Sequence, residues 1–254
     1  MTEFRLNSAE GKQILAMIRQ GDYAHPGEEE AIALSLNGLT ASPAQRLLDV
    51  GCGRGGTADW MVRQGWRTVV GIDRDAEAIR YARERYPGPS FQCCDVLAID
   101  PQTLGRFDQI CLFNAFYAFA DQQAALARLR SVAAEGALIR LFDYAQATRQ
   151  PLPQALGEEI GQPIRLDVVA EQLSKAGWRL VEVQDLSGHY QRWYAGFLEQ
   201  LGARREGILR NHGGDWYAFV SQWYGALHQA LLERELRGVL ILAEVDQAAG
   251  QPTA

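Results

Sequence analysis

Short apolar segments alternate with helical patterns between residues 46 and 144. Each apolar segment is nearly continuous in hydrophobic residues, as expected for a strand covered on both faces of a sheet. The five segments are RLLDV (46–50), RTVVGID (67–73), SFQCCDV (90–96), FDQICLFN (107–114) and ALIRLFDY (137–144). Helical periodicity fills the intervals at 57–64, 75–86 and 121–134. This alternation predicts a parallel sheet with helices on both sides.

The pattern is less regular after residue 144. Residues 150–162 contain two prolines and two glycines, which predicts a loop or a broken helix. Asp167 is placed to cap a helix in DVVAEQLSKAG, which Gly177 ends. WRLVEVQDL (178–186) predicts a sixth strand and RGVLILAEV (237–245) a seventh, with a mostly helical stretch between them.

Two further helices are expected before the first strand, over residues 8–19 and 26–36. Pro26 and the three glutamates that follow Gly27 suit a helix start, because acidic side chains favour the N-terminal end of the helix dipole. We therefore expect three parts. They are an N-terminal helical cap (1–45), a core (46–186 and 237–246) and a helical insertion (187–236) that forms a lid over the substrate.

The composition is typical of a soluble globular protein, with 47% hydrophobic and 22% charged residues among 254. The formal net charge of −6 argues against a nucleic-acid partner, because phosphate binding requires a basic surface. No apolar run is long enough to predict a membrane span or a signal peptide. The four cysteines form no CxxC pair, which favours reduced thiols, a cytoplasmic location and no metal site. We expect a monomer or a homodimer.

A glycine-rich loop follows the first predicted strand, in DVGCGRGG (49–56). Gly51, Gly53 and Gly56 fit the pattern G-x-G-x-x-G between a strand and a helix, where the backbone turns sharply and a ligand approaches closely. Asp73 ends the second strand and can accept hydrogen bonds from ribose hydroxyls. These features fit either a dinucleotide or S-adenosylmethionine.

Two carboxylates favour S-adenosylmethionine. Asp49 stands directly before the glycines, where it would repel a pyrophosphate but would accept from the ammonium of an amino-acid group. Asp95 ends the third strand and can accept from an adenine amino group. A last strand that follows a long insertion is also unusual for NAD enzymes. An NAD-dependent oxidoreductase stays open as the alternative.

The motif set resembles that of the class I S-adenosylmethionine-dependent methyltransferases. The matching segments are LLDVGCGRGG, VVGIDRD, CCDV, FDQICLFNAF and EGALIRLFDY, and the resemblance covers residues 46–245. It implies an α/β, Rossmann-like sheet of seven strands in the order 3-2-1-4-5-7-6, with the last strand antiparallel. It also implies a methyltransferase that uses S-adenosyl-L-methionine and releases S-adenosyl-L-homocysteine. We expect the cofactor site to contain Asp49, Gly51, Cys52, Gly53, Gly55, Asp73, Arg74, Asp95, Val96 and Asn114.

The helical insertion is rich in aromatic residues and contains half of the six tryptophans. Aromatic faces stabilise cations, so the insertion would suit an amine that gains positive charge on methylation. The alternative is that these rings only pack the lid onto the sheet. We expect Trp193 to contact the acceptor, together with Asp143 and Tyr144 at the end of the fifth strand.

The segment QDLSGHYQRWYAGFLEQL (184–201) resembles the phosphoethanolamine and sarcosine/dimethylglycine N-methyltransferases, which implies that Tyr190 contacts the substrate. Those families carry an Asp and, four residues later, a His after the fourth strand. Asn114 and Ala118 stand at these positions, so the catalytic His is missing. A binding module without catalysis is therefore a further alternative.

We expect a direct in-line methyl transfer to a small-molecule acceptor, with an amine nitrogen as the first candidate atom, in which positioning and desolvation lower the barrier. An O- or C-directed transfer is the alternative. A base is needed only if the acceptor arrives protonated, and the candidates are Tyr23, His25, His189 and Tyr190. Tyr23 and Tyr190 are the pair expected to position the acceptor.

Overall fold

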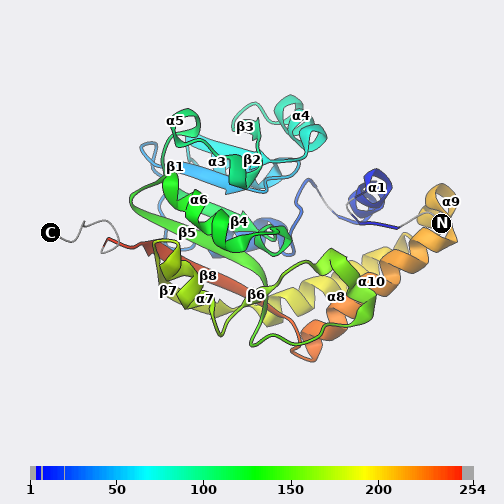
Figure 1. Ribbon diagram of the computed structural model, residues 1–254. Coiled ribbons are helices and arrows are strands. Elements are labelled where there is room, and N and C mark those ends of the chain that lie inside the picture. The colour runs from blue at the N-terminus through cyan, green and yellow to red at the C-terminus, as the bar shows by residue number, and fades with distance from the viewer. Residues whose placement is uncertain (1–3, 7, 20, 248–254) are drawn as a thin grey trace.

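The computed structural model of the protein describes residues 4–6, 8–19 and 21–247. Its strands form one twisted sheet in the order β3-β2-β1-β4-β5-β8-β7, and β8 runs antiparallel to both neighbours (Figure 1). The strands are β1 (Arg46–Val50), β2 (Thr68–Asp73), β3 (Ser90–Cys93), β4 (Phe107–Phe113), β5 (Ala133–Gln146), β6 (Ile164–Arg165), β7 (Trp178–Asp185) and β8 (Arg237–Val245). The predicted fold class is confirmed. The short β6, which pairs with β5, was not predicted, so the predicted sixth and seventh strands are β7 and β8 here and the strand order is the predicted one.

Helices cover both faces of the sheet, because successive strand residues point to opposite sides and both sides are apolar. One core cluster contains Leu47 and Phe142 of the sheet together with residues of α1, α2, α3, α4, α8 and α10. The other contains Leu48 and Ile139 together with residues of α6 and α7. The helices are α1 (Ala9–Ile18), α2 (Glu28–Ser35), α3 (Gly56–Arg63), α4 (Ala76–Arg85), α5 (Pro101–Leu104), α6 (Gln122–Ser131), α7 (Val169–Lys175), α8 (Ser187–Ala203), α9 (Arg205–His212) and α10 (Gly214–Leu232).

Local sequence explains several helix boundaries. Asp75 accepts from the first backbone N–H groups of α4, and Asp121 caps α6 in the same way. The expected cap at Asp167 is wrong. Asp167 instead forms an ion pair with Arg165 at 2.5 Å, and no side chain caps α7. The guanidinium two residues away is a stronger partner for this carboxylate than an exposed backbone N–H.

The insertion between β7 and β8 is helical, as expected. Its helices α8 and α10 extend beyond the sheet toward α1 and α9 (Figure 1). The proline-containing connection between β5 and β6 contains the 3-10 segment η3 (Gln154–Ile160), broken at Gly157, which agrees with the predicted broken helix. The division into cap, core and substrate lid stays a prediction.

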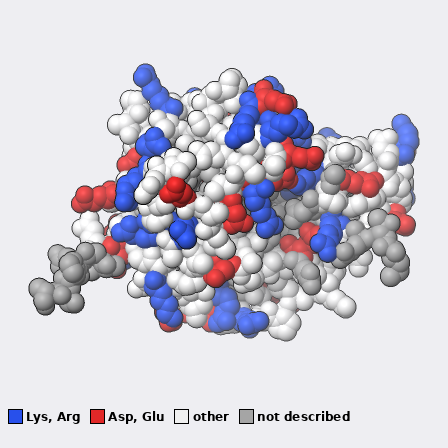
Figure 2. Space-filling view, turned by 45° about the horizontal axis from the view of Figure 1, so that its top comes forward, with Lys and Arg blue, Asp and Glu red and all other residues white. Residues whose placement is uncertain are grey.

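Within residues 4–6, 8–19 and 21–247, no helix is both long and apolar enough to cross a membrane. The same ranges contain no group of three or more His, Cys, Asp or Glu side chains placed to hold a metal ion. All four cysteines lie in this part of the chain and are unpaired. Acidic and basic side chains are intermixed on the face shown in Figure 2.

Candidate functional site

The glycine loop lies between the carboxyl ends of β1 and β2. The backbone N–H groups of Gly51 and Cys52 both donate to Ile72 O, at 2.8 and 3.0 Å, and tie the loop to β2. Gly51, Gly53 and Gly55 have φ values of +74°, +51° and +88°, a region that other L-residues rarely adopt. The sequence therefore places glycine where the backbone requires it.

Only one of these glycines borders open space. A Cβ at Gly51 would lie 2.6 Å from Ala115 Cβ, and one at Gly55 would lie 2.6 Å from the Phe91 ring. A Cβ at Gly53 would meet nothing closer than Ala24 Cβ at 3.9 Å. Gly53 thus leaves room for a ligand, whereas the other two allow close packing.

Two predicted carboxylates stand at the ends of neighbouring strands. Asp73, at the end of β2, accepts from Gly53 N and from Asp75 N, each at 2.9 Å. Asp95 follows β3, is exposed, and accepts from Leu97 N at 2.8 Å as it starts the 3-10 turn η1 (Val96–Ala98). Ligands of open α/β sheets bind at this edge. Backbone N–H groups thus hold both carboxylates at the edge where the parallel strands end.

Asp49 is the buried carboxylate of the site. Its side chain is 1% exposed, and Oδ2 has no hydrogen-bond partner. Burial raises the pKa of Asp49 to about 7, and the charge of Asp73 adds to the effect. An unpaired buried carboxylate is costly. A ligand ammonium would relieve this cost, so the residues present fit the amino-acid end of S-adenosylmethionine.

Three other residues expected in the cofactor site, Cys52, Val96 and Arg74, lie in three different environments. Cys52 is buried, and its Sγ lies 2.8 Å from where a Cβ on Gly71 would be, so it packs against β2. Val96 is buried in the core on the far face of the sheet. Arg74 is exposed.

Residues 21–27, which we call the N-terminal strap, lie against the glycine loop. Asp22 accepts from the hydroxyls of Tyr81 and Tyr86, at 3.0 and 2.7 Å, and pairs with Arg54 at 3.1 Å. Asp22 O is 2.9 Å from where a Cβ on Gly56 would be. The contacts of Asp22 could not be predicted from the sequence, because no linear pattern relates Asp22 to α4.

The strap also positions His25. This side chain is 2% exposed, and its Nε2 lies 3.0 Å from Thr57 Oγ1 in α3. Burial lowers the pKa of His25 to about 3, so the imidazole is neutral at physiological pH. His189 of α8 is also buried, and burial lowers its pKa as well. Its Nε2 lies 2.1 Å from where a Cβ on Gly27 would be, so it packs against the strap.

The structure does not bring Tyr23 and Tyr190 together. The Tyr23 hydroxyl donates to Glu29 Oε1 at 2.7 Å and accepts from Arg63 at 3.3 Å, on an exposed part of the surface. Tyr190 is fully buried and donates to Asn114 Oδ1 at 3.0 Å. Among the described residues, no hydrogen bond or ring contact joins the two tyrosines. The two tyrosines therefore do not form the pair that was expected to position the methyl acceptor.

Asn114 ends β4 in an unusual conformation. Its φ is +47°, its N–H donates to Phe142 O at 2.7 Å, and its buried Nδ2 has no hydrogen-bond partner. Left-handed backbone at a non-glycine residue is strained and often accompanies a functional site. The unpartnered amide is consistent with the predicted place of Asn114 in the cofactor site.

The carboxylate of Asp143 accepts hydrogen bonds from the backbone of the protein. It is fully buried, and its oxygens accept from Phe116 N (2.8 Å), Tyr117 N (3.2 Å) and Tyr144 N (2.7 Å). Burial raises the pKa of Asp143 to about 7. Backbone N–H groups donate to both carboxylate oxygens of Asp143. We therefore interpret Asp143 as a residue that positions the turn η2 (Phe116–Ala118) and not as a contact of the methyl acceptor. That turn presents Tyr117.

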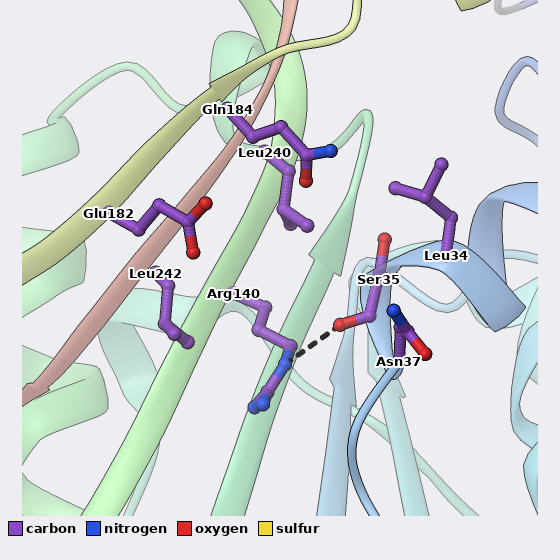
Figure 3. Close-up of a pocket in the computed structure, with 8 residues that line it drawn as sticks. All are labelled: Leu34, Ser35, Asn37, Arg140, Glu182, Gln184, Leu240 and Leu242. Atoms are coloured by element: carbon purple, nitrogen blue, oxygen red, sulfur yellow. Dashed lines mark hydrogen bonds between the residues drawn. The ribbon is translucent and has the colours of Figure 1, made fainter.

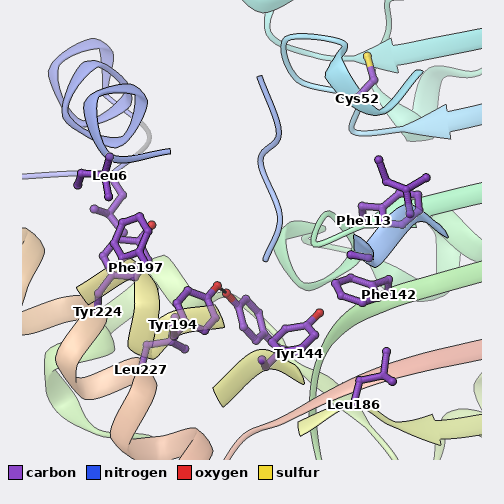
Figure 4. Packing of buried hydrophobic residues seen from close by; sticks show 14 of the residues in the cluster. Leu6, Cys52, Phe113, Phe142, Tyr144, Leu186, Tyr194, Phe197, Tyr224 and Leu227 are labelled. Carbon is purple, nitrogen blue, oxygen red and sulfur yellow. Dashed lines mark hydrogen bonds between the residues drawn. The ribbon is translucent and has the colours of Figure 1, made fainter. Parts of the chain in front are cut away.

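Most aromatic rings of the insertion pack in the core. The Tyr144 hydroxyl forms a hydrogen bond with the Tyr194 hydroxyl, and both rings are buried (Figure 4). Trp193 is partly buried and stacks on Phe197 with ring centroids 5.5 Å apart. Packing therefore accounts for most of these rings, and Trp193 keeps exposed surface.

A separate cavity of about 280 Å³ lies between α2 and strands β5, β7 and β8 (Figure 3). Its buried Arg140 donates from Nε to Ser35 O at 2.9 Å, at the C-terminal end of α2, and from Nη1 to Gln109. Positive charge stabilises this helix end. None of the predicted site residues lines this cavity.

Comparison with known proteins identifies the class of the site. A family model described as "Methyltransferase domain" matches residues 48–141, which run from β1 through the glycine loop into β5. Residues 48–141 are thus similar to a methyltransferase domain. The resemblance seen in the motifs, the enzyme class and the cofactor that this class uses are thereby confirmed.

Curated relatives of the chain are methyltransferases whose names differ in the acceptor that they give. The chain is 28% identical over 178 residues to an O-methyltransferase of Pyrenophora dematioidea, covering 66% of each chain. It is 27% identical over 220 residues to a probable fatty acid methyltransferase of Pseudomonas putida, covering 76% of this chain and 56% of the relative. The chain thus spans two thirds or less of the length of these relatives.

Solved structures share the fold of the methyltransferase domain. The cyclopropane synthase MmaA2 from Mycobacterium tuberculosis has a TM-score of 0.77 at 19% identity, with 94% of each chain covered. Phosphoethanolamine N-methyltransferase 2 of Haemonchus contortus has a TM-score of 0.80 at 17% identity, with 95% of this chain and 58% of that chain covered. At these identities the likeness concerns the fold alone.

Proposed function

We propose that the protein transfers a methyl group from S-adenosylmethionine to a small-molecule acceptor by direct in-line displacement. The observation that carries the proposal is Asp49, a buried carboxylate with an unpartnered oxygen, which stands in β1 two residues before the glycine loop begins at Gly51. This arrangement suits a ligand with an ammonium group rather than a pyrophosphate. It favours S-adenosylmethionine over NAD.

Different residues of the chain would bind different parts of the cofactor. Asp49 would accept from the ammonium, Asp73 from the ribose and Asp95 from the adenine amino group. Asn114, whose Nδ2 is unpartnered, would contact the methionine end. The bound cofactor supplies an activated sulfonium methyl. The protein then needs chiefly to position the acceptor and exclude water.

The acceptor atom that we propose is an amine nitrogen. A neutral amine attacks the sulfonium without a base, which fits a site whose histidines, His25 and His189, are buried with lowered pKa values. The product cation would lie against the aromatic faces of Tyr117 and Trp193, which stabilise positive charge. The relatives named above include N-directed and O-directed enzymes, so an O- or C-directed transfer is the alternative.

Two measurements test the proposed function. Calorimetry with S-adenosylhomocysteine and with NAD should show binding of the first alone, and binding of NAD alone would contradict the cofactor assignment. The second measurement follows a radiolabelled methyl donor over a panel of amines, phenols, thiols and carboxylic acids. Labelled amines are expected. Binding of S-adenosylhomocysteine with no turnover across the panel would favour a binding module without catalysis.

The proposal also covers the partner of the protein, its oligomeric state and its location in the cell. We propose a small molecule as the partner, with no nucleic acid, and a monomer or homodimer in the cytoplasm. The intermixed surface charges and the net charge of −6 support the exclusion of nucleic acid. A band-shift titration with RNA and DNA tests it, and a salt-sensitive complex would contradict it.

A further inference from the structure

Another cavity, of about 610 Å³, lies where the end of β5, the segment η3, the short strand β6 and the first turns of α6 and α7 meet. Its volume is within the range of small-molecule binding sites. None of the residues expected in the cofactor or acceptor site lines this cavity. Six of the residues that line it are glutamines, namely Gln122, Gln146, Gln150, Gln154, Gln162 and Gln172.

Backbone carbonyls orient the side-chain amides of Gln122 and Gln146. Gln122 Nε2 donates to Phe116 O of the turn η2 at 3.0 Å and to Gln162 O at 2.6 Å. Gln146, which ends β5 and is only 5% exposed, donates from Nε2 to Gln150 O at 3.0 Å. The surrounding backbone therefore holds both amides in place.

Gln150 and Gln162 are oriented in the same way. Gln150 Nε2 donates to Glu235 O at 3.1 Å, and Gln162 Nε2 donates to Ala120 O at 3.2 Å. A backbone carbonyl oxygen only accepts hydrogen bonds, so in all four glutamines the amide nitrogen faces the backbone. The amide oxygen lies on the other side of the group and, with two lone pairs, can accept from a ligand. The cavity thus offers several hydrogen-bond acceptors.

The charges around the cavity restrict the ligand further. Arg149 and Arg165 line it, whereas no Asp or Glu is among its described lining residues. Asp167 pairs with Arg165 and offsets that charge. A cationic ligand would face the guanidinium groups, and a ligand with acceptor atoms alone would face the amide oxygens. A hydroxyl group suits both, because it donates to an amide oxygen and accepts from a guanidinium N–H.

Apolar side chains lie between these polar groups. Leu152, Ile160 and Val168 line the cavity together with Pro153 and Pro163. They can pack against the C–H groups of a ligand, because such contacts remove apolar surface from water. A carbon ring that carries several hydroxyls presents C–H groups on its faces and hydroxyls around its edge. This combination matches the mixture of apolar and amide groups in the cavity.

We propose that this cavity binds a polyhydroxylated ring, the chemical group of sugars and cyclitols. The inference goes beyond the proposed function and does not require it. Two sources share this chemistry, a hydroxylated part of the methyl acceptor and a separate sugar or cyclitol. The turn η2, to which Gln122 is bonded, begins two residues after Asn114. A ligand in the cavity would thus lie against the turn that follows the cofactor edge.

Calorimetry on the full chain with three neutral probes tests the proposal. Methyl α-D-glucopyranoside and myo-inositol are the polyhydroxylated rings, and cyclohexanol is a ring with a single hydroxyl. At least one of the first two should bind about tenfold more tightly than cyclohexanol, because several hydroxyls can bond to amides. Absence of binding by both, or an affinity no higher than that of cyclohexanol, would overturn the proposal.

Glutamine variants test whether the amides recognise the ring. Gln122→Met and Gln146→Met each remove one amide and keep an unbranched side chain. Each should lower the affinity for the tighter probe about three- to tenfold. Gln123→Met is the matched control, because Gln123 also donates to a backbone carbonyl, Gln172 O at 3.2 Å, but does not line the cavity. It should bind like the wild type, and unchanged affinity in both lining variants would contradict the proposal.

A cavity-filling variant keeps every glutamine. Val168 stands at the start of α7 and lines the cavity, so Val168→Phe should occupy the space of the ring and abolish binding of the probe. The affinity for S-adenosylhomocysteine checks the folding of this variant and of both lining variants, and it should equal that of the wild type. Binding of the probe to Val168→Phe with wild-type affinity would place the ring elsewhere and overturn the proposal.

A radiolabelled methyl donor distinguishes the two sources. Transfer of label to D-glucosamine, reduced in Gln146→Met, would assign the ring to the methyl acceptor. Binding of a probe without transfer of label would assign it to a separate ligand. A protein that binds S-adenosylhomocysteine but neither polyhydroxylated probe would overturn this inference alone. A protein that binds a probe but no S-adenosylhomocysteine would overturn the proposed function alone.

Discussion

The hydroxyl of Tyr190 donates a hydrogen bond to Asn114 Oδ1 at 3.0 Å, which joins the helical insertion to the end of β4. Asn114 has a φ of +47°, so its backbone is strained and needs support from its surroundings. Tyr190 supplies that support from α8, where it is fully buried. The insertion thus shapes the cofactor edge even where its rings do not contact a ligand.

Tyr190→Phe should lower kcat/KM about tenfold, because the Asn114 side chain loses its buried hydrogen-bond donor. Stability should fall by about 1 kcal/mol. Steady-state kinetics and denaturant unfolding measure the two effects. Tyr217→Phe is the control, since Tyr217 is a partly buried tyrosine of α10, and its kcat/KM should stay close to the wild-type value. Equal turnover in both variants would exclude Tyr190 from shaping the site.

Tyr23→Phe should leave kcat/KM nearly unchanged. Its hydroxyl interacts with Glu29 and Arg63, which are both exposed, and such surface contacts contribute about 0–1 kcal/mol. Kinetics with the same acceptor as for Tyr190→Phe provide the comparison. A loss as large as in Tyr190→Phe would return Tyr23 to the acceptor site.

Gly53→Ala should weaken binding of S-adenosylhomocysteine about tenfold or more, because the added methyl group enters open space beside Asp73. Gly136→Ala is a matched control. Its φ of +69° resembles the +51° of Gly53, and no atom lies within 4 Å of the added Cβ. Both variants should lose about 1–2 kcal/mol of stability from backbone strain. Unchanged affinity in Gly53→Ala, measured by calorimetry, would show that the ligand does not approach this loop.

Asp49 should make the stability of the ligand-free protein depend on pH. Burial raises its folded-state pKa from 3.8 to about 7, so the folded state holds the proton more tightly than the unfolded state. The stability contribution of this group is therefore complete below pH 4 and is lost as pH rises toward 7. Asp49→Asn removes the charge and should be more stable than the wild type at pH 8, by about 2–4 kcal/mol, and similar at pH 4.

Denaturant unfolding at the two pH values checks this expectation, with the exposed Asp215→Asn as a control that should show no such difference. Asp49→Asn should also bind S-adenosylhomocysteine more weakly at pH 8, because the ammonium loses its acceptor. Greater stability without weaker binding would mean that Asp49 does not contact the ligand.

The glycine loop and the carboxylates of this site could be predicted from the sequence, because each lies at the end of an apolar strand and its place follows from local pattern. The positions of Tyr23 and Asp143 could not. Tyr23 pairs with charged neighbours from α2 and α3, and Asp143 turns toward backbone donors that follow β4. The hydrogen-bond partners of these two side chains depend on which groups the packing of separate elements brings close to them.

The chain's alternating apolar and helical segments predicted the parallel sheet and placed glycines and acids at the strand ends, whereas the strand order was implied by the resemblance of the motifs to a known family. These features are local, since backbone conformation and burial act within a few residues. Tertiary structure alone decided that Tyr190 supports Asn114 and that Arg19 meets Tyr224. Each pair is joined across dozens of residues or more, and only the packing of separate helices against one sheet determines which side chains meet.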